Sequence, residues 1–378
     1  MSAPAASSPP APPAPPAAPV APAALAAPAA PAPTAAEHAL DFAPLAALVT
    51  RAFPDSGPLA VEPMPGGAST RRYFRVTVPG GHAVGMFVPD GAKPEEIAQG
   101  ASAAARWPFL EVRDLLAARG VDVPAVHGED TAHGWVLLED LGDDTLAAYL
   151  ARNPAEREAL YVRAVTDLAR AQAALGELPR GSVVATRAFD EALLGWEIHH
   201  FREWALEARG VTLSAADRAT FDRLADRLAG RIAGWPRAFV HRDYQSRNLM
   251  VRPGGALCWI DFQDALLGPR IYDLVALLND SYQTFDRAFV EARLDDYARA
   301  CALDAAGRAE LGREFDRVTV QRKLKDAGRF VFIDRVKKNP HFLPFVEPTI
   351  AKVRASLARL ADDDDMRTLA ALLDRVLP

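Results

Sequence analysis

The segment HRDYQSRN at residues 241–248 and the aspartate of WIDF, Asp261, supply the groups that transfer of a phosphoryl group requires. Asp243 would accept the proton of an attacking hydroxyl as a general base. Asn248 and Asp261 would hold Mg²⁺ on the phosphates of ATP, because this ion takes few protein ligands and completes its octahedron with water and phosphate oxygens. Arg247 lies four residues after Asp243 and would orient that aspartate or contact the phosphate.

A β-hairpin is predicted to bring the two proposed metal ligands together. The apolar runs at 249–251 and 257–260 indicate strands, and Pro253-Gly254-Gly255 between them is a turn signal. Asn248 and Asp261 therefore bracket a hairpin whose open end would place both oxygen ligands beside one cation. A polar surface turn is the alternative, but the complete eight-residue pattern followed by a strand-borne aspartate favours the catalytic interpretation.

Composition limits the other classes of protein. The chain has 378 residues and a formal net charge of −6, and its first residues are almost only Ala, Pro and Ser. We expect residues 1–37 to be a disordered tail, because such a segment cannot form a core and does not have the pattern of a secretory signal. No apolar run is long enough for a membrane helix, and no basic tract favours nucleic acid. Cys258 and Cys301, far apart in the sequence, are typical of a reducing cytoplasm.

The region after the tail predicts a small antiparallel sheet. Period-two alternation and turn residues indicate strands at 59–64, 72–78, 83–88, 121–126 and 134–138. Helices are expected at 45–53 and along 95–119, with a break near Pro108.

A glycine-containing loop joins the first two predicted strands. It would fold over the ATP phosphates and offer backbone N–H groups to them. A plain turn is the alternative for a Gly-Gly pair, and the downstream motif favours the phosphate interpretation. The residues assigned to this nucleotide site are Gly66, Gly67, Ala68, Ser69, Thr70 and Arg71.

The sequence changes from an apolar strand to a polar linker at residues 139–143. We interpret this linker as a hinge between two lobes, where the backbone of Glu139 and Leu141 would hydrogen-bond adenine. An acidic loop without such a role is an equal alternative for this segment alone. The expected domains are an N-lobe at 38–139, which would bind the nucleotide, and a C-lobe at 140–378, which would hold the catalytic loop, the metal site and the substrate cleft.

Helical periodicity dominates the second half of the chain. It predicts helices at 155–175, 188–208 and 215–232, and a further helical run that begins at Pro269. The acceptor would lie between the catalytic loop and the helices after the hinge. The residues in that region expected to contact it are Glu197, His200 and Gln245.

The chain resembles the aminoglycoside phosphotransferase family, which are small-molecule kinases. The resemblance extends from about residue 38 over most of the chain and rests on the order of the glycine loop, the hinge, HRDYQSRN and WIDFQDALLGPRIYDLVALL at 259–278. It implies a bilobal, protein-kinase-like α+β fold, with a small antiparallel β-sheet in the N-lobe and a mainly helical C-lobe. It also implies that Asp273 is structural and holds the catalytic loop by hydrogen bonds.

Within this family, GGASTRRYFRV at 66–76 and LLEDLGDDTL at 137–146 are most similar to the anomeric N-acetylmuramate/N-acetylglucosamine kinases of cell-wall recycling. This similarity implies transfer of the ATP γ-phosphate to the C1 hydroxyl of an amino sugar in the bacterial cytoplasm. The segment 196–202 is not strongly acidic, as the cleft for a polycationic aminoglycoside would be, and this favours the sugar. We expect a monomer that acts on a small molecule and has no nucleic-acid or membrane partner.

One departure from protein kinases leaves alternatives open. Their third strand carries a lysine that binds the α- and β-phosphates, whereas this chain has Met86 in that strand. We expect one of Lys93, Arg71 and Arg72 to supply the missing charge, although a solvated surface cation is the favoured interpretation for any single one of them. The alternative functions are a kinase for an aminoglycoside or another small alcohol, and a nucleotide-binding pseudokinase. The intact catalytic and metal-binding positions argue against the pseudokinase.

Overall fold

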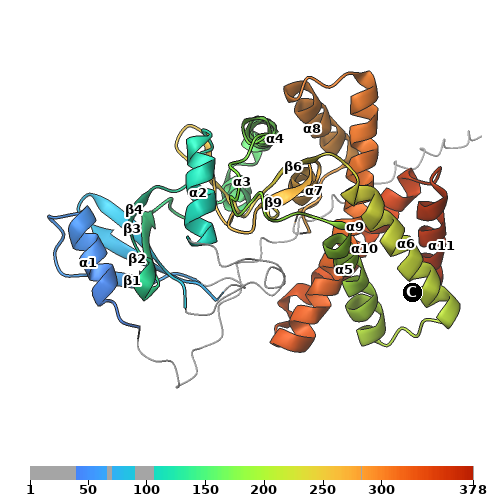
Figure 1. The fold of residues 1–378 in the computed structure, drawn as a ribbon, viewed down its shortest axis with the longest axis horizontal. Helices are drawn as coiled ribbons and strands as arrows, with labels where there is room; N and C mark the ends of the chain where they lie inside the picture. Colours follow the sequence, from blue (N-terminus) through green and yellow to red (C-terminus); the bar gives the residue numbers. More distant parts are fainter. Residues whose placement is uncertain (1–39, 66–69, 90–105, 282, 378) are drawn as a thin grey trace, which may run out of the picture.

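A computed structural model describes residues 40–65, 70–89, 106–281 and 283–377. Figure 1 shows a twisted sheet with a helix on its outer side, followed by a larger helical part, which we call the N-lobe and the C-lobe. This arrangement confirms the expected α+β class with a small antiparallel sheet and a mainly helical second part. The tail expected at 1–37, the loop residues Gly66, Gly67, Ala68 and Ser69, and Lys93 lie outside the described residues.

Five antiparallel strands form the N-lobe sheet in the order β1-β2-β3-β5-β4. Their bounds are Val61–Pro63 for β1, Arg72–Val78 for β2, Gly81–Phe87 for β3, Val126–Asp130 for β4 and Trp135–Glu139 for β5. The prediction of a strand at 121–126 was wrong, because residues 121–125 precede β4. This stretch is instead held by the C-lobe: the carbonyl oxygen of Asp122 accepts from Trp259 N–H at 2.8 Å.

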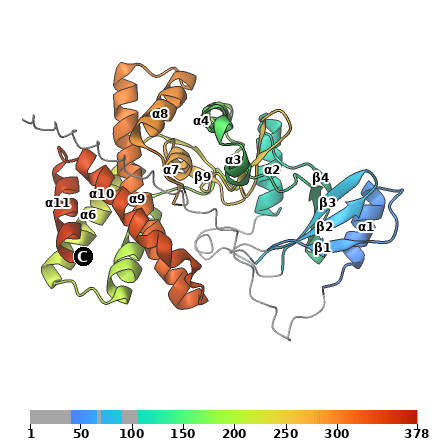
Figure 2. The same ribbon diagram turned by 180° about the vertical axis from the view of Figure 1, so that it is seen from behind.

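Helices cover both faces of the sheet, because its central strands are apolar on both sides. On one face Trp135 and Leu137 pack against Leu45 and Leu48 of α1 (Ala43–Ala52), which lies on the outer side in Figure 2. On the other face Val84, Met86 and Val136 belong to the same cluster as Phe109 and Leu116 of α2 (Pro108–Ala118). At position 85 glycine leaves room for α1, because a Cβ there would lie 2.9 Å from the Leu45 side chain.

The C-lobe is built mainly from helices around the 33-residue helix α9. The helix predicted at 188–208 is divided into α5 and a π-helical segment, η3 (Phe201–Leu206). Helices α5 and α9 are in close contact, since a Cβ on Gly328 would lie 2.6 Å from the His200 carbonyl oxygen. The helix bounds are Leu146–Arg152 for α3, Arg157–Ala174 for α4, Glu191–His200 for α5, Ala215–Ala233 for α6, Tyr272–Leu278 for α7, Arg287–Ala300 for α8, Ala305–Lys337 for α9, Val346–Arg359 for α10 and Asp364–Val376 for α11. None of the helices in the described ranges has the length and apolar character to cross a membrane.

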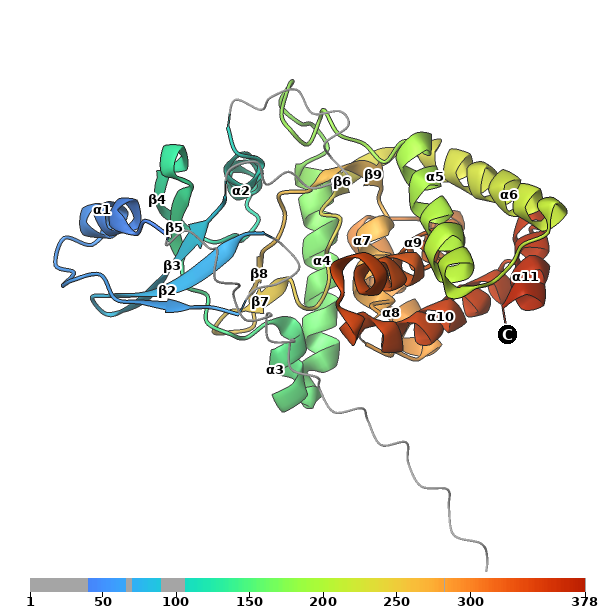
Figure 3. The ribbon, with the colours of Figure 1, turned by 90° about the horizontal axis from the view of Figure 1, so that it is seen from below.

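Two short antiparallel pairs in the C-lobe frame the catalytic segment. Strand β6 (Arg237–Val240) pairs with β9 (Leu266–Pro269), and β7 (Leu249–Val251) pairs with β8 (Leu257–Trp259). The helical run predicted from Pro269 was wrong at its start, because Pro269 still pairs with Arg237 and α7 begins at Tyr272. Figure 3 shows β7 and β8 between the five-stranded sheet and α4, at the boundary of the two lobes.

Candidate active site

The catalytic loop leaves β6 and is fixed at its start by one buried carboxylate. Asp273, the second residue of α7, accepts the backbone N–H of His241 at 2.6 Å and that of Arg242 at 3.0 Å. Arg242 has a φ of 81°, a left-handed conformation that costs a non-glycine residue free energy and persists only where the surroundings impose it. These contacts confirm that Asp273 holds the catalytic loop by hydrogen bonds.

Opposing effects act on the pKa of the Asp273 carboxyl. Burial raises the pKa of its carboxyl to about 7, while the two backbone N–H groups and the charge of Arg322 act in the opposite direction. Asp273 is completely inaccessible to solvent, so its two hydrogen bonds compensate for removing the carboxyl from water.

Asp243, the proposed general base, is paired with an arginine that the motif does not contain. Arg322 of α9 lies 3.3 Å from Asp243 Oδ1 through Nη2, and its Nη1 donates to the Arg242 carbonyl oxygen at 2.8 Å. The guanidinium is 1% exposed and lies over the Tyr272 ring at 4.6 Å, whereas the Asp243 side chain is 39% exposed. Arg322 therefore binds the catalytic loop on its buried side and leaves the Asp243 carboxylate accessible to an acceptor.

The charges around Asp243 keep it ionised. Burial raises the pKa of this carboxyl, but the positive charges of Arg322, Lys325 and Arg242 more than offset that effect, and the pKa lies below its usual range. An ionised carboxylate can accept a proton from a hydroxyl, as a general base must.

The predicted hairpin exists and brackets the two proposed metal ligands. Leu249 pairs with Trp259, and Ile260 N–H donates to the Asn248 carbonyl oxygen at 3.0 Å, so Asn248 and Asp261 lie at the open end. The Asn248 side-chain nitrogen donates to the carbonyl oxygen of Asp243 at 2.8 Å. The oxygen Oδ1 of Asn248 is therefore the atom that can bind a cation.

A bound cation would stabilise the ionised form of Asp261, because the surroundings of this carboxyl disfavour its negative charge. Burial raises the pKa of its carboxyl and the negative charge of Asp243 raises it further, although Gln263 donates to its Oδ1 at 3.0 Å. The Asp261 carboxylate and the Asn248 amide oxygen form a donor set that fits Mg²⁺ together with phosphate and water. Across the described ranges, no group of three or more His, Cys, Asp or Glu side chains is arranged to hold a metal ion.

His241 joins the start of the loop to the strand that precedes Asp261. Its Nε2 lies 3.1 Å from the Ile260 carbonyl oxygen, which requires a proton on Nε2. Burial lowers the pKa of His241 to about 4, so the ring is neutral near pH 7. The imidazole also packs edge-on to Tyr244 and Trp259. It thereby connects the segment that carries the proposed general base to the segment that carries the second proposed metal ligand.

Among the cations proposed to replace the strand-three lysine, the structure brings Arg71 to the site. Arg71 lies just before β2 with Thr70, and its Nη1 is 3.6 Å from Asp261 Oδ1. Its side chain is 14% exposed. Met86 lies in β3, the strand that carries the lysine in protein kinases, and is completely buried in the core.

Acidic side chains of the proposed hinge are paired with two arginines. Arg252, in the turn of the hairpin, contacts the Glu139 carboxylate at 2.5 Å and 3.0 Å. Arg75 of β2 donates to Asp140 at 2.7 Å and to Asp143 at 2.8 Å. Arg252 thus connects the linker to the C-lobe, and Arg75 connects it to the N-lobe. Because the Glu139 carboxylate is already paired, a contact of Glu139 with adenine would be made by its backbone.

The residues predicted to contact the acceptor differ in their exposure and in their contacts. Glu197 is completely buried, 3.8 Å from Arg242 and hydrogen-bonded to Gln321, so it supports the catalytic loop. His200 is 6% exposed and packs among the rings of Trp196, Trp204 and Phe332. Gln245 N–H donates to the Asp243 carbonyl oxygen, and Arg247 is exposed at the end of the loop. Arg322, which no sequence motif marks, contacts Asp243 directly.

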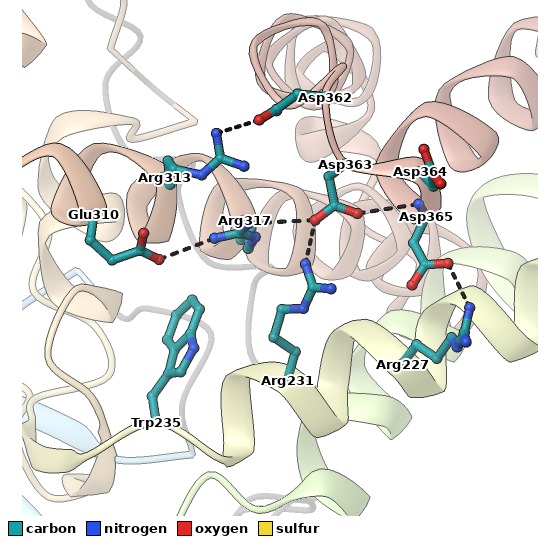
Figure 4. Close-up of a pocket in the computed structure, with 10 residues that line it drawn as sticks. All are labelled: Arg227, Arg231, Trp235, Glu310, Arg313, Arg317, Asp362, Asp363, Asp364 and Asp365. Carbon is teal, nitrogen blue, oxygen red and sulfur yellow. Dashed lines mark hydrogen bonds and ion pairs between the residues drawn. The ribbon is translucent and has the colours of Figure 1, made fainter.

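A separate polar pocket of about 700 Å³ lies between α6, α9 and the start of α11. Figure 4 shows that its arginines are paired with its acidic residues, such as Arg231 and Arg317 with Asp363 and Arg313 with Asp362. Arg313 and Arg317 project from a different face of α9 than Arg322, since five residues correspond to about 140° of rotation on a helix. These ion pairs attach α11 to the rest of the C-lobe.

Comparison with known proteins supplies a family for this geometry. Residues 60–311 match the phosphotransferase enzyme family. A protein of Pseudomonas putida named N-acetylmuramate/N-acetylglucosamine kinase is 32% identical over 81% of this chain and 86% of the relative. A protein of the same name from Neisseria meningitidis is 32% identical over 80% of this chain and 90% of its own.

Solved structures with low sequence identity share the fold. The choline kinase of Cryptosporidium parvum superposes with a TM-score of 0.59 at 11% identity and covers 88% of this chain and all of its own. The gentamicin complex of the phosphotransferase APH(2″)-IIa has a TM-score of 0.54 at 14% identity, over 84% of this chain and 97% of that one. The expected protein-kinase-like fold is thereby confirmed.

Proposed function

Because the chain belongs to the phosphotransferase enzyme family, we propose that it transfers the γ-phosphate of ATP to the C1 hydroxyl of N-acetylmuramate or N-acetylglucosamine. One observation carries the proposal: Asp243, Asn248 and Asp261 are assembled around one loop and hairpin in a chain related over most of its length to proteins named for that activity. We place the reaction in peptidoglycan recycling in the cytoplasm, with a monomeric enzyme.

The reaction would proceed by in-line displacement. The Asp243 carboxylate accepts the proton of the sugar hydroxyl while that oxygen forms a bond to the γ-phosphorus. The bond from this phosphorus to the β–γ bridging oxygen breaks, and ADP leaves. Arg322 keeps Asp243 ionised and in place through its contact at 3.3 Å. Asn248 and Asp261 would hold Mg²⁺, which offsets charge on the phosphate oxygens when it is bound.

The nucleotide would lie between the lobes. The glycine loop that ends at Thr70 would cover the phosphates, and the backbone at Glu139 and Leu141 would bind adenine. The geometry supports this placement because Arg71, at the end of that loop, lies 3.6 Å from Asp261. Arg247 and Gln245 remain candidates for contacts with the transferred phosphate and the acceptor, and His200 for a contact with the acceptor.

The acceptor test is ADP release from Mg-ATP with N-acetylmuramate, N-acetylglucosamine, kanamycin and choline. We expect turnover on the two N-acetyl sugars and complete loss when EDTA removes Mg²⁺. The phosphorylated product should lose its reducing end, which assigns transfer to C1. Turnover only on kanamycin or choline would refute the sugar assignment, and nucleotide binding without turnover on any acceptor would indicate a pseudokinase.

Arg71 should supply the positive charge that a lysine provides in protein kinases, in the strand where this chain has Met86. We expect Arg71→Ala to raise KM for ATP about 10-fold or more, as the loss of a hydrogen bond between charged groups does, with a smaller change in KM for the sugar. Steady-state kinetics with varied ATP would measure this. Arg51→Ala, on the exposed end of α1, is the matched control and should leave KM unchanged. An unchanged KM in Arg71→Ala would assign the charge to another residue.

A further inference from the structure

Helix α9 carries a dense group of charges next to the general base. Arg322, Lys323, Lys325 and Asp326 fall within five consecutive residues, and Arg322 contacts Asp243. Lys323 Nζ lies 2.9 Å from Asp326 Oδ2, and Lys325 Nζ lies 3.3 Å from Asp326 Oδ1. One carboxylate is thus shared by two ammonium groups.

Charges outside this group also act on it: the Asp280 carboxylate and the Lys352 ammonium near Lys323, and the Glu197 carboxylate near Lys325. Arg322 is matched by Asp243, and Arg242 is matched by Glu197 at 3.8 Å. Counted by itself, the set of Lys323, Lys325 and Asp326 carries one excess positive charge. A partly buried charge of this kind is costly unless an anion pairs with it.

Of these two lysines, Lys325 has the side chain that is more exposed to solvent. Lys323 is 2% exposed, and its ammonium also donates to the Ser281 hydroxyl at 3.1 Å. Lys325 has a 16% exposed side chain. A ligand could therefore approach the Lys325 ammonium.

Lys325 belongs to the helix that contacts the proposed general base, and not to the loop or hairpin that carries the proposed metal ligands. It is three residues after Arg322, so both side chains project from the same side of α9, about 4.5 Å apart along the helix axis. Asp243 is contacted from α9 by Arg322 and from the hairpin by Asn248, and the Lys325 charge acts on Asp243. The proposed metal ligands and Lys325 thus approach the general base from different elements.

We infer that Lys325 binds a carboxylate of the acceptor and so determines a preference for N-acetylmuramate over N-acetylglucosamine. The two sugars differ in the lactyl ether of the first, which ends in a carboxylate. A charge-assisted hydrogen bond from the ammonium would compensate for removing that carboxylate from water. The inference rests on the proposed function, because it assumes that these sugars are the acceptors.

The test compares kcat/KM for the two sugars in Lys325→Met, Lys325→Arg and the wild type. We expect the ratio of N-acetylmuramate to N-acetylglucosamine to fall by about 10- to 100-fold in Lys325→Met, the range for loss of a charged hydrogen bond, and to be largely retained in Lys325→Arg. Lys337→Met, on the exposed end of the same helix, is the matched control and should keep the wild-type ratio. Equal losses on both sugars would overturn the inference and assign the charge to the transferred phosphate.

A substrate-side measurement covers the case in which Lys325→Met does not fold. With the wild-type enzyme, N-acetylmuramate whose carboxylate is converted to a carboxamide should show a KM about 10- to 100-fold higher than the acid, by the same loss of charge pairing. Equal KM values for acid and amide would overturn the inference while the proposed function stands. No wild-type turnover on either sugar would overturn the proposed function, and the inference with it.

Discussion

Asp243→Asn should lower kcat by about 10²- to 10⁴-fold, the range for loss of a general base. The asparagine keeps the size of the aspartate, and its Oδ1 can still accept a hydrogen bond from Arg322, which contacts Asp243 at 3.3 Å. The neutral amide, however, cannot take the proton of the acceptor hydroxyl. The effect should fall on kcat, and the affinity for ATP should change little. Steady-state kinetics and calorimetric ATP titration would separate the two quantities.

The control for this variant is Asp295→Asn on α8, where the side chain is half-exposed and 3.8 Å from Arg308. It has the same change in charge and should keep wild-type turnover and melting temperature. If Asp243→Asn retains near-normal turnover, the group that accepts the proton is not Asp243. If it loses turnover and ATP affinity together, Asp243 acts through nucleotide binding instead of proton transfer.

Local patterns in the sequence were sufficient for the elements that form the loop and hairpin. The alternation at 72–78 predicted β2 at its observed bounds, and the turn Pro253-Gly254-Gly255 predicted the pairing of β7 with β8. Both elements are determined by residues close together in the chain. The placement of Asn248 and Asp261 at one end of the hairpin follows from the same short-range information.

Long-range contacts explain what the sequence did not reveal. Residues 121–125 are apolar enough for a strand, but Asp122 is held by Trp259 and by Arg252, both of the C-lobe. Arg322 is separated from Asp243 by 79 positions, and no pattern distinguishes it from the other arginines of α9. Glu197 could be assigned to the right part of the C-lobe, but only the packing of α5 on α9 shows that it is buried against Arg242.

Asp273→Ala should reduce both stability and turnover, because it removes the acceptor of two buried backbone N–H groups. An unsatisfied buried donor costs about 1–3 kcal/mol, so the free energy of unfolding should fall by roughly 2–6 kcal/mol. The loop would also lose the contacts at 2.6 Å and 3.0 Å that hold Arg242 in its left-handed conformation. We therefore expect kcat to fall even at temperatures where the variant is folded. Urea denaturation would measure the first effect, and kinetics well below the melting temperature the second.

Asp316→Ala separates loss of stability from loss of the loop. Asp316 is also a buried carboxylate, on α9, and it accepts hydrogen bonds from Ser356 at 3.1 Å and from Arg359 at 3.0 Å, within the helical packing of α9 and α10. Its removal should lower the free energy of unfolding as well, while the folded enzyme keeps its kcat, since none of these contacts involves the catalytic loop. A wild-type kcat in folded Asp273→Ala would show that the loop keeps its conformation without this carboxylate. Equal losses of kcat in the two variants would attribute both to general loosening of the C-lobe.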